Sequence, residues 1–219
     1  MNPLCKPIST AEQAINISDS YLSKRVPSKI LFEQSAPLTD IYAVTSGAYK
    51  LSQQIDGGET KVIGLRFPGE LIGEDALYLK TYNYTAIGVN DSSACKVSVD
   101  QMISCGKLVP EIQQSFIDLL SRQNYIRQRN FQAFIGKKSA ESLLAAFLLN
   151  IVERSANYTG NLNCIDLPIN RNDIADFLGL RRETLSRVFS KLQKDQLIQV
   201  EGKKIKLLHS QELSKLADF

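Results

Sequence analysis

Apolar and polar residues alternate over much of the first half of the chain. The odd positions of residues 49–55 are mostly apolar. The same alternation continues beyond the turn sequence of residues 56–58, at Ile63, Leu65 and Phe67. A period of two on both sides of an Asp-Gly pair predicts a β-hairpin.

This half of the chain contains further turn signals. They lie at Pro68-Gly69 and around residues 90–92. Several short antiparallel strands at this spacing indicate a small barrel or β-roll. Because the pattern changes character near Pro110, we expect the β-roll to form a domain of its own over residues 1–109.

A helical period replaces the alternation after Pro110. Apolar residues then fall near a repeat of about 3.5, at Ile112, Phe116, Ile117, Leu119, Leu120, Ile126, Phe131 and Phe134. A helix over residues 110–136 is long, and its apolar stripe needs a partner. A second copy of the helix would supply one, which predicts a homodimer interface formed by Phe116, Ile117, Leu120, Asn124, Arg127 and Phe131. The alternative is that the helix packs on its own β-roll.

Residues 137–219 are predicted to form a separate, mainly helical domain. Its first helix has one apolar face and should end before Gly160. A shorter helix should follow, with Asn170 as its N-cap, Asp173 three residues on, and Gly179 at its end.

The next helix begins only a few residues later, which is the joint of a helix-turn-helix. Its apolar residues have the spacing i, i+3, i+4 and i+7, at Leu185, Val188, Phe189 and Leu192. The opposite face carries Arg182, Glu183, Ser186, Arg187 and Ser190. Arginine can donate two hydrogen bonds to guanine, glutamate can accept from cytosine and serine can do either, so this face suits base readout in a major groove. The alternative is an i, i+4 ion pair between Glu183 and Arg187 on a solvated helix.

A basic hairpin is expected behind this helix, with strands at residues 197–200 and 204–207. Such a hairpin is a wing that can lie along the DNA backbone. The candidate phosphate contacts are Arg171, Thr184 and Lys203.

Charge favours the same partner for the same region. Residues 1–135 carry 13 basic and 13 acidic side chains, whereas residues 136–219 carry 13 basic and 10 acidic ones. Residues 181–194 alone carry five basic side chains and one acidic side chain. A local basic excess is what a phosphate backbone attracts, although a charged helix face is often merely solvated.

Composition excludes several classes of protein. The chain is 43% hydrophobic and 22% charged, as folded globular proteins are. Neither a signal peptide nor a membrane-spanning stretch is visible, so we expect no membrane association and a cytoplasmic location. The single histidine, with no His-based triad and no convincing carboxylate pair, argues against an enzyme.

Three motifs carry a resemblance to a known family. They are residues 67–74 (FPGELIGE), residues 140–147, with Ala140-Glu141 and LAAF, and residues 183–187 (ETLSR). With them the chain resembles, from about Ser28 onward, the Crp/Fnr family of transcriptional regulators, closer to the fumarate and nitrate reduction regulator branch. The resemblance implies an α+β fold: a cyclic-nucleotide-binding-like β-roll, a long dimerisation helix and a C-terminal winged helix-turn-helix. It also implies a palindromic operator in double-stranded DNA. We expect an activator with RNA polymerase as a partner, while the sequence itself leaves activator and repressor open.

The resemblance leaves two half-sites open. Similarity to the fumarate and nitrate reduction regulator implies a TTGA core, in which Glu183 and Arg187 read the G·C pair and Ser186 an adjacent T. Arg182 instead resembles the cyclic AMP receptor protein, whose matching arginine reads an outer guanine of a TGTGA core.

The candidate effector pocket comprises Gly73, Glu74, Tyr84 and Thr85. In the cyclic AMP pocket of the family, a Gly-Glu pair is matched by a later Arg-Ser pair, whose arginine meets the phosphate. Here that later pair is Tyr84-Thr85, so the charged partner is missing and cyclic AMP is disfavoured.

No cofactor is predicted. The family's [4Fe-4S] cluster needs four thiolates, and only Cys5 precedes the barrel cysteine, Cys95, which leaves an intrachain cluster disfavoured. Haem is poorly supported because the one histidine, His209, lies past the wing. The sequence does not identify an effector, and constitutive DNA binding without one is an alternative. The alternative function is a ligand-binding interaction module whose winged helix no longer binds DNA.

Overall fold

The computed structural model describes residues 23–26, 29–55, 57–100, 110–134, 139–161 and 163–217 of the 219-residue chain. The chain divides into two compact units, Met1–Tyr125 and Ile126–Phe219. Among the helices of the described residues, none has both the length and the apolar character that crossing a membrane requires.

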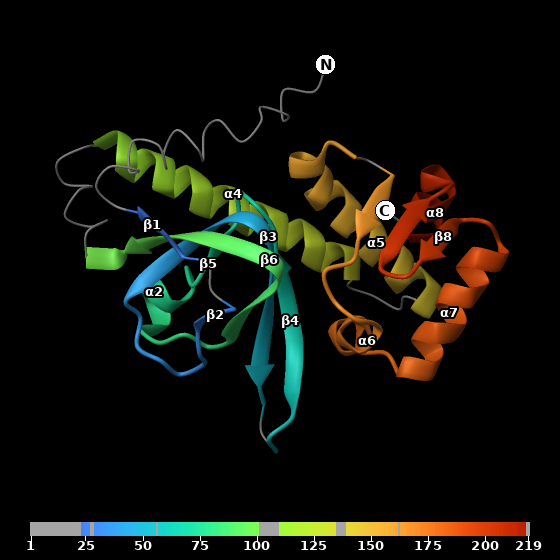
Figure 1. Cartoon of the computed structure of the whole chain (residues 1–219), viewed down its shortest axis with the longest axis horizontal. Coiled ribbons are helices and arrows are strands. Elements are labelled where there is room, and N and C mark those ends of the chain that lie inside the picture. Colours follow the sequence, from blue (N-terminus) through green and yellow to red (C-terminus); the bar gives the residue numbers. More distant parts are fainter. Residues whose placement is uncertain are drawn as a thin grey trace. The chain divides into compact units, whose positions relative to one another are not determined.

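The first unit is an antiparallel β-roll. Its strands are β1 (Ser23–Val26), β2 (Ile30–Phe32), β3 (Asp40–Gln54), β4 (Thr60–Arg66), β5 (Leu71–Ile72) and β6 (Thr85–Ser98), and the short helix α2 (Ala76–Leu79) follows β5. The sheet order is β1-β6-β3-β4, with β2 paired to β6 and β5 paired to β3. The two long strands β3 and β6 pair with each other and hold the other strands in place (Figure 1). The predicted hairpin is confirmed as the β3–β4 pair.

Aromatic side chains fill the inside of the roll. Tyr49 and Ile72 are fully buried. Phe32 stacks on Tyr82 with the ring centroids 3.6 Å apart. Gly73 has a φ of +88°, and a Cβ at this position would lie 3.0 Å from Tyr82 Cε1. Glycine therefore fits here for two reasons, its backbone conformation and the lack of space.

The expectation that Ile63 continues the inward alternation is wrong. Ile63 is 41% exposed, whereas Val62 is buried. Leu51 pairs with Gly64 but Ser52 pairs with Val62, so Ile63 is the extra residue of a β-bulge. A bulge shifts the inward side of the strand by one residue, which alternation alone does not reveal.

The turn expected around residues 90–92 is also wrong, because these residues lie within β6. Ser46 pairs with Ser93 and Ala48 pairs with Val89, so β6 contains more residues than β3 between these two pairs. Turn-forming residues therefore mark an irregular point in a continuous strand.

Helix α4 (Pro110–Phe134) is the predicted long helix, and one side of it packs on the roll. Phe116, Leu119 and Leu120 contact a buried cluster of the roll, made of Ile41, Ala43, Leu71 and Cys95. The alternative that the helix packs on its own β-roll therefore holds for this side, which includes two of the predicted dimer residues.

The second unit contains α5 (Ala140–Thr159), β7 (Cys164–Asp166), α6 (Arg171–Leu178), α7 (Arg182–Lys194), β8 (Ile198–Glu201), β9 (Lys204–Leu207) and α8 (Ser210–Ala217). Helix α5 supplies the centre of its core, where Leu144 and Phe147 are buried, and ends as predicted at Gly160. The predicted hairpin is confirmed as β8 and β9, and β7 adds a third strand to it. The α+β fold with an N-terminal roll and a C-terminal helix-turn-helix is thus confirmed.

Candidate nucleic-acid interface

Short-range capping sets the ends of α6. Asn170 Oδ1 accepts a hydrogen bond of 2.9 Å from the backbone N–H of Asp173. Gly179 ends the helix in the left-handed region, with a φ of +64°. Both features agree with the sequence prediction, and residues 179–181 alone separate α6 from α7.

Helix α7 has one buried side and one exposed side, as its spacing predicts. The buried side consists of Leu185, Val188, Phe189 and Leu192, none of them more than 7% exposed. The exposed side consists of Arg182, Glu183, Ser186, Arg187 and Ser190, which we call the recognition face. The buried side packs into the core of the unit, so the position of the recognition face on this unit is fixed.

The charged side chains of the recognition face are available to a partner. Within the described part of the chain, no ion pair or hydrogen bond engages the side chains of Arg182, Glu183 or Arg187. The alternative pair between Glu183 and Arg187 is therefore not formed. Ser190 Oγ donates to the backbone oxygen of Ser186 at 3.1 Å. Two guanidinium groups and one carboxylate thus point to solvent on one helix, the donor and acceptor set that base edges match.

Arg171 has a second role that the sequence does not reveal. Its guanidinium carbon lies 3.3 Å from the ring centroid of Phe189, so the first residue of α6 covers a core residue of α7. Burial lowers the pKa of Arg171 from its ordinary value. A guanidinium stacked by its flat face keeps its N–H edges for a phosphate, so the predicted contact and the stacking are compatible.

Helix α7 is also tied to α5 at its far end. Lys191 Nζ lies 2.7 Å from Glu141 Oε1. The hydrogen bond with Glu141 raises the pKa of Lys191 from its ordinary value. One of the five basic side chains of residues 181–194 therefore already has a partner within the protein.

The other phosphate candidates lie at the start of α7 and at the tip of the wing. Thr184 is partly exposed in the first turn of α7, and Lys203 is exposed beside Gly202 in the turn between β8 and β9. Their phosphate contacts stay predictions.

The six predicted dimer residues fall on different sides of α4. Phe116 and Leu120 face the roll, as described above. Ile117 is 47% exposed and Phe131 65% exposed, and Asn124 and Arg127 are exposed as well. Tyr125, at 62% exposure, was not predicted. Seven residues separate Ile117 from Asn124 and Asn124 from Phe131, the repeat of a helix–helix seam. The dimer interface stays a prediction.

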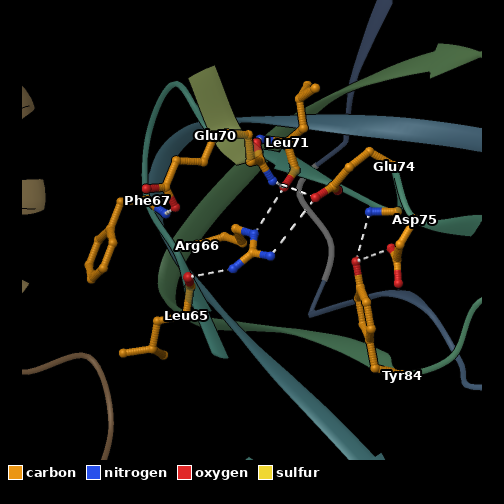
Figure 2. Close-up of polar contacts among 10 residues, drawn as sticks. Leu65, Arg66, Phe67, Glu70, Leu71, Glu74, Asp75 and Tyr84 are labelled. Atoms are coloured by element: carbon orange, nitrogen blue, oxygen red, sulfur yellow. Dashed lines mark hydrogen bonds and ion pairs between the residues drawn. The ribbon is translucent and has the colours of Figure 1, made fainter. Parts of the chain in front are cut away.

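Of the candidate effector residues, Gly73 and Tyr84 bond to each other (Figure 2), whereas Glu74 and Thr85 bond to other parts of the chain. The backbone N–H of Gly73 donates to Tyr84 Oη at 2.9 Å, and Tyr84 Oη donates to Asp75 Oδ1 at 3.0 Å. Burial raises the pKa of Tyr84 far above its ordinary value. Thr85 Oγ1 accepts a hydrogen bond from the backbone N–H of Gln34.

Two residues of this pocket escape sequence reasoning. Arg66 Nη2 lies 3.9 Å from Glu74 Oε1, and Gln123 of α4 also donates to that oxygen. Neither residue belongs to a local motif, since they lie 8 and 49 positions from Glu74 along the chain. Only the folded roll brings them together.

The structure describes some of the residues on which the cofactor predictions rest. Cys95 is 5% exposed and packs among apolar side chains, as a small core residue does, while Cys5 lies outside the described residues. His209 is exposed between β9 and α8. Within the described ranges, no group of three or more His, Cys, Asp or Glu side chains is arranged as a metal site.

Comparison with known families matches each unit separately. Residues 25–107 match the family model of the cyclic nucleotide-binding domain, and residues 144–216 match that of the Crp-like helix-turn-helix domain.

Curated relatives span nearly the whole chain. The transcriptional activator protein FnrA of Stutzerimonas stutzeri is 31% identical over 99% of this chain and 90% of its own length. The transcriptional activator protein anr of Pseudomonas aeruginosa is 32% identical over 98% of this chain and 89% of its own length. Among solved structures, FixK2 from Bradyrhizobium japonicum shares the fold, with a TM-score of 0.76, 22% identity, and coverage of 89% of this chain and 97% of that one.

Proposed function

The chain belongs to the Crp/Fnr family of transcriptional regulators, and we propose that it binds a palindromic DNA site as a homodimer, with α7 in the major groove. The observation that carries the proposal is the recognition face, whose charged side chains have no partner within the described protein. An acidic side chain among basic ones is repelled by phosphates, so Glu183 is best explained by a base edge that donates a hydrogen bond.

Four side chains of the recognition face, all except Ser190, have an assigned base. Arg187 and Glu183 read the G·C pair of a TTGA core, and Ser186 reads the adjacent T. In the alternative, a TGTGA-like half-site, Arg182 reads an outer guanine. These assignments carry over from the family by matching positions, and the exposure of all four side chains is compatible with them.

Phosphate contacts set the position of α7 in the groove. Arg171, Thr184 and Lys203 supply them from the start of α6, the start of α7 and the wing. Contacts of this kind fix orientation and contribute affinity, but they carry no sequence information.

The homodimer is formed by the exposed side of α4. Ile117, Asn124 and Phe131 recur at intervals of seven, and two of them are large apolar side chains exposed to solvent in the single chain. A two-fold dimer presents two copies of α7, which read two half-sites about one DNA turn apart. The proposed setting is the cytoplasm, where the bound dimer contacts RNA polymerase and activates transcription.

Binding to labelled duplexes tests this proposal. The chain is titrated against an inverted repeat of TTGA half-sites, an inverted repeat of TGTGA half-sites and a scrambled duplex of equal length. We expect salt-dependent binding to at least one repeat and weak binding to the scrambled duplex. Inserting about half a DNA turn between the half-sites should abolish tight binding, because the dimer holds its two helices at a fixed spacing.

Absence of specific binding to every duplex, including sites selected from random DNA, would leave the alternative. The chain would then be an interaction module with an inactive winged helix. A monomer in solution that still binds one half-site would overturn the dimer alone.

A further inference from the structure

A polar bridge joins α4 to the candidate effector pocket of the β-roll, formed by Gly73, Glu74, Tyr84 and Thr85. We call these four residues the sensor pocket. The bridge runs through Gln123, a residue of α4 that is only 8% exposed. The bridge lies entirely within the first unit. It concerns the same pocket that a cyclic nucleotide occupies in the resemblance described above.

The amide of Gln123 makes three hydrogen bonds. Its Oε1 accepts from the backbone N–H of Leu71 at 2.7 Å, and its Nε2 donates to the backbone oxygen of Leu71 at 2.8 Å. The same Nε2 donates to Glu74 Oε1 at 2.5 Å. Gln123 thus binds the short edge strand β5 much as a neighbouring strand would, and it reaches the glutamate beside that strand.

Arg66, the last residue of β4, contacts the same group of residues (Figure 2). Its Nε donates to the backbone oxygen of Leu71 and its Nη1 to that of Leu65, each at 3.1 Å. Its Nη2 lies 3.9 Å from Glu74 Oε1. The guanidinium is therefore held by three groups of its own chain, and its side chain is only 12% exposed.

Tyr84 binds the backbone N–H of Gly73, the other residue of the Gly-Glu pair. Its hydroxyl accepts from Gly73 N–H at 2.9 Å and donates to Asp75. Of the groups that the Gly-Glu pair would offer to a ligand, the Gly73 N–H and one carboxylate oxygen of Glu74, Oε1, are thus each bonded within the chain. A ligand would have to displace buried, charge-assisted hydrogen bonds in order to bind there.

We infer that Gln123 is a positioning residue that takes the place of an effector, so that α4 is held on the roll, and operator DNA is bound, without a cyclic nucleotide. The inference rests on the proposed function, because it describes how DNA binding is regulated. The physical reason is that α4 carries both Gln123 and the proposed dimer residues on either side of it. Fixing the helix on the roll at Gln123 therefore fixes the middle of that surface, next to Asn124.

The first test measures the wild-type chain with cyclic AMP and with cyclic GMP as probes. Calorimetry should detect no saturable binding of either nucleotide, and operator affinity should change by less than about twofold when they are added. Saturable nucleotide binding, or a rise in operator affinity of about tenfold or more, would overturn the inference. Failure to bind any DNA in every arm would overturn the proposed function instead, while calorimetry still decides whether the pocket accepts a nucleotide.

The second test removes the bridge with Gln123→Met, which keeps the length of the side chain and loses its hydrogen bonds. Gln114→Met is the matched control, because Gln114 lies on the same helix and, among the described residues, its side chain bonds only to the exposed Asp118. We expect Gln123→Met to lower operator affinity about tenfold at a temperature where both variants are fully folded. We expect the control to stay within about twofold of the wild type.

Amide hydrogen exchange provides the readout that follows the bridge itself. The Leu71 N–H should exchange faster in Gln123→Met, because its acceptor is Gln123 Oε1. Its exchange rate should not change in the control. If Gln123→Met does not fold, Gln123→Glu replaces it: the carboxylate keeps the acceptor, loses the donor and repels Glu74, with the same expected loss. Equal operator affinity for the wild type and the folded variant would overturn the positioning role.

Discussion

The sensor pocket and the recognition face treat their polar groups in opposite ways. In the pocket, Glu74 is buried, Arg66 is mostly covered, and both are bonded to their own chain. On the recognition face, Glu183 and Arg187 are only four residues apart, yet they form no ion pair with each other. The same residue types thus stabilise the fold in one region and remain available in the other. Exposure together with the lack of an internal partner separates a binding surface from a structural network.

The largest effect is expected in the sensor pocket, at the tightly packed Gly73. Gly73→Ala forces a Cβ to within 3.0 Å of the Tyr82 ring in a left-handed backbone conformation. It should lower the free energy of unfolding by about 2–3 kcal/mol. Gly69→Ala is the control, since Gly69 also has a positive φ but nothing within 4 Å of its added Cβ, and should cost about 1 kcal/mol. Urea unfolding measures both losses, and equal losses would show that packing adds nothing at Gly73.

The second largest effect is expected on DNA binding by the recognition face. Arg187→Ala should cost about 1–3 kcal/mol of binding to the operator and relax the choice at one base pair. Lys203→Ala should weaken binding to operator and random DNA to a similar degree, because phosphates are the same in every sequence. Fluorescence titrations on operator and scrambled duplexes compare the two variants. The assigned roles would be contradicted if both variants lost the same amount on both duplexes.

Arg171 lies between the two cases, since it is stacked on Phe189 within the protein and is also a proposed phosphate contact. Arg171→Met removes the guanidinium from Phe189 and should lower the free energy of unfolding by about 1 kcal/mol. It should also weaken binding to random DNA, as Lys203→Met should, but Lys203→Met should leave stability unchanged. Urea unfolding and a random-duplex titration on both variants check this difference. A stability loss without any loss of DNA affinity would assign Arg171 to the fold alone.

These expectations draw on features that the sequence reveals to different extents. The caps at Asn170 and Gly179 and the buried stripe of α7 depend on neighbours within four residues, so they could be predicted. The bulge at Ile63 could not, because the register between β3 and β4 decides it. Strand β7 and helix α8 were missed for a related reason, since they are short and gain their stability by packing on β9 and α5.

The candidate site follows the same division. The recognition face follows from a helical period, so its five residues were predicted together. The contacts of Arg66 and Gln123 with Glu74 could not be predicted, because other elements of the chain, β4 and α4, supply these two residues. The stacking of Arg171 on Phe189 is a similar case: each residue has an evident local role, and their contact depends on how α6 and α7 pack.

The smallest effect is expected at the exposed pair of Lys191 and Glu141. The pKa of Lys191 is raised by Glu141, so the pair stabilises the fold below the ordinary lysine pKa of about 10.5. This stabilisation is lost as the pH rises through the raised pKa of the folded state. The difference in melting temperature between the wild type and Glu141→Gln should therefore shrink at pH values above about 10.5. Glu212→Gln, an exposed carboxylate on α8, is the control, and a difference that stays constant with pH would contradict the pair's contribution.

The most direct test of the account is the ratio of affinities for an operator and a scrambled duplex, measured at about 0.15 M salt with the wild type and Arg187→Ala. If the recognition face reads bases, the wild type should prefer the selected inverted repeat by about a thousandfold or more. Arg187→Ala should lose most of its preference at the G·C pair. A wild type that binds both duplexes equally, or a variant that keeps the full preference, would contradict the claim that α7 reads the sequence.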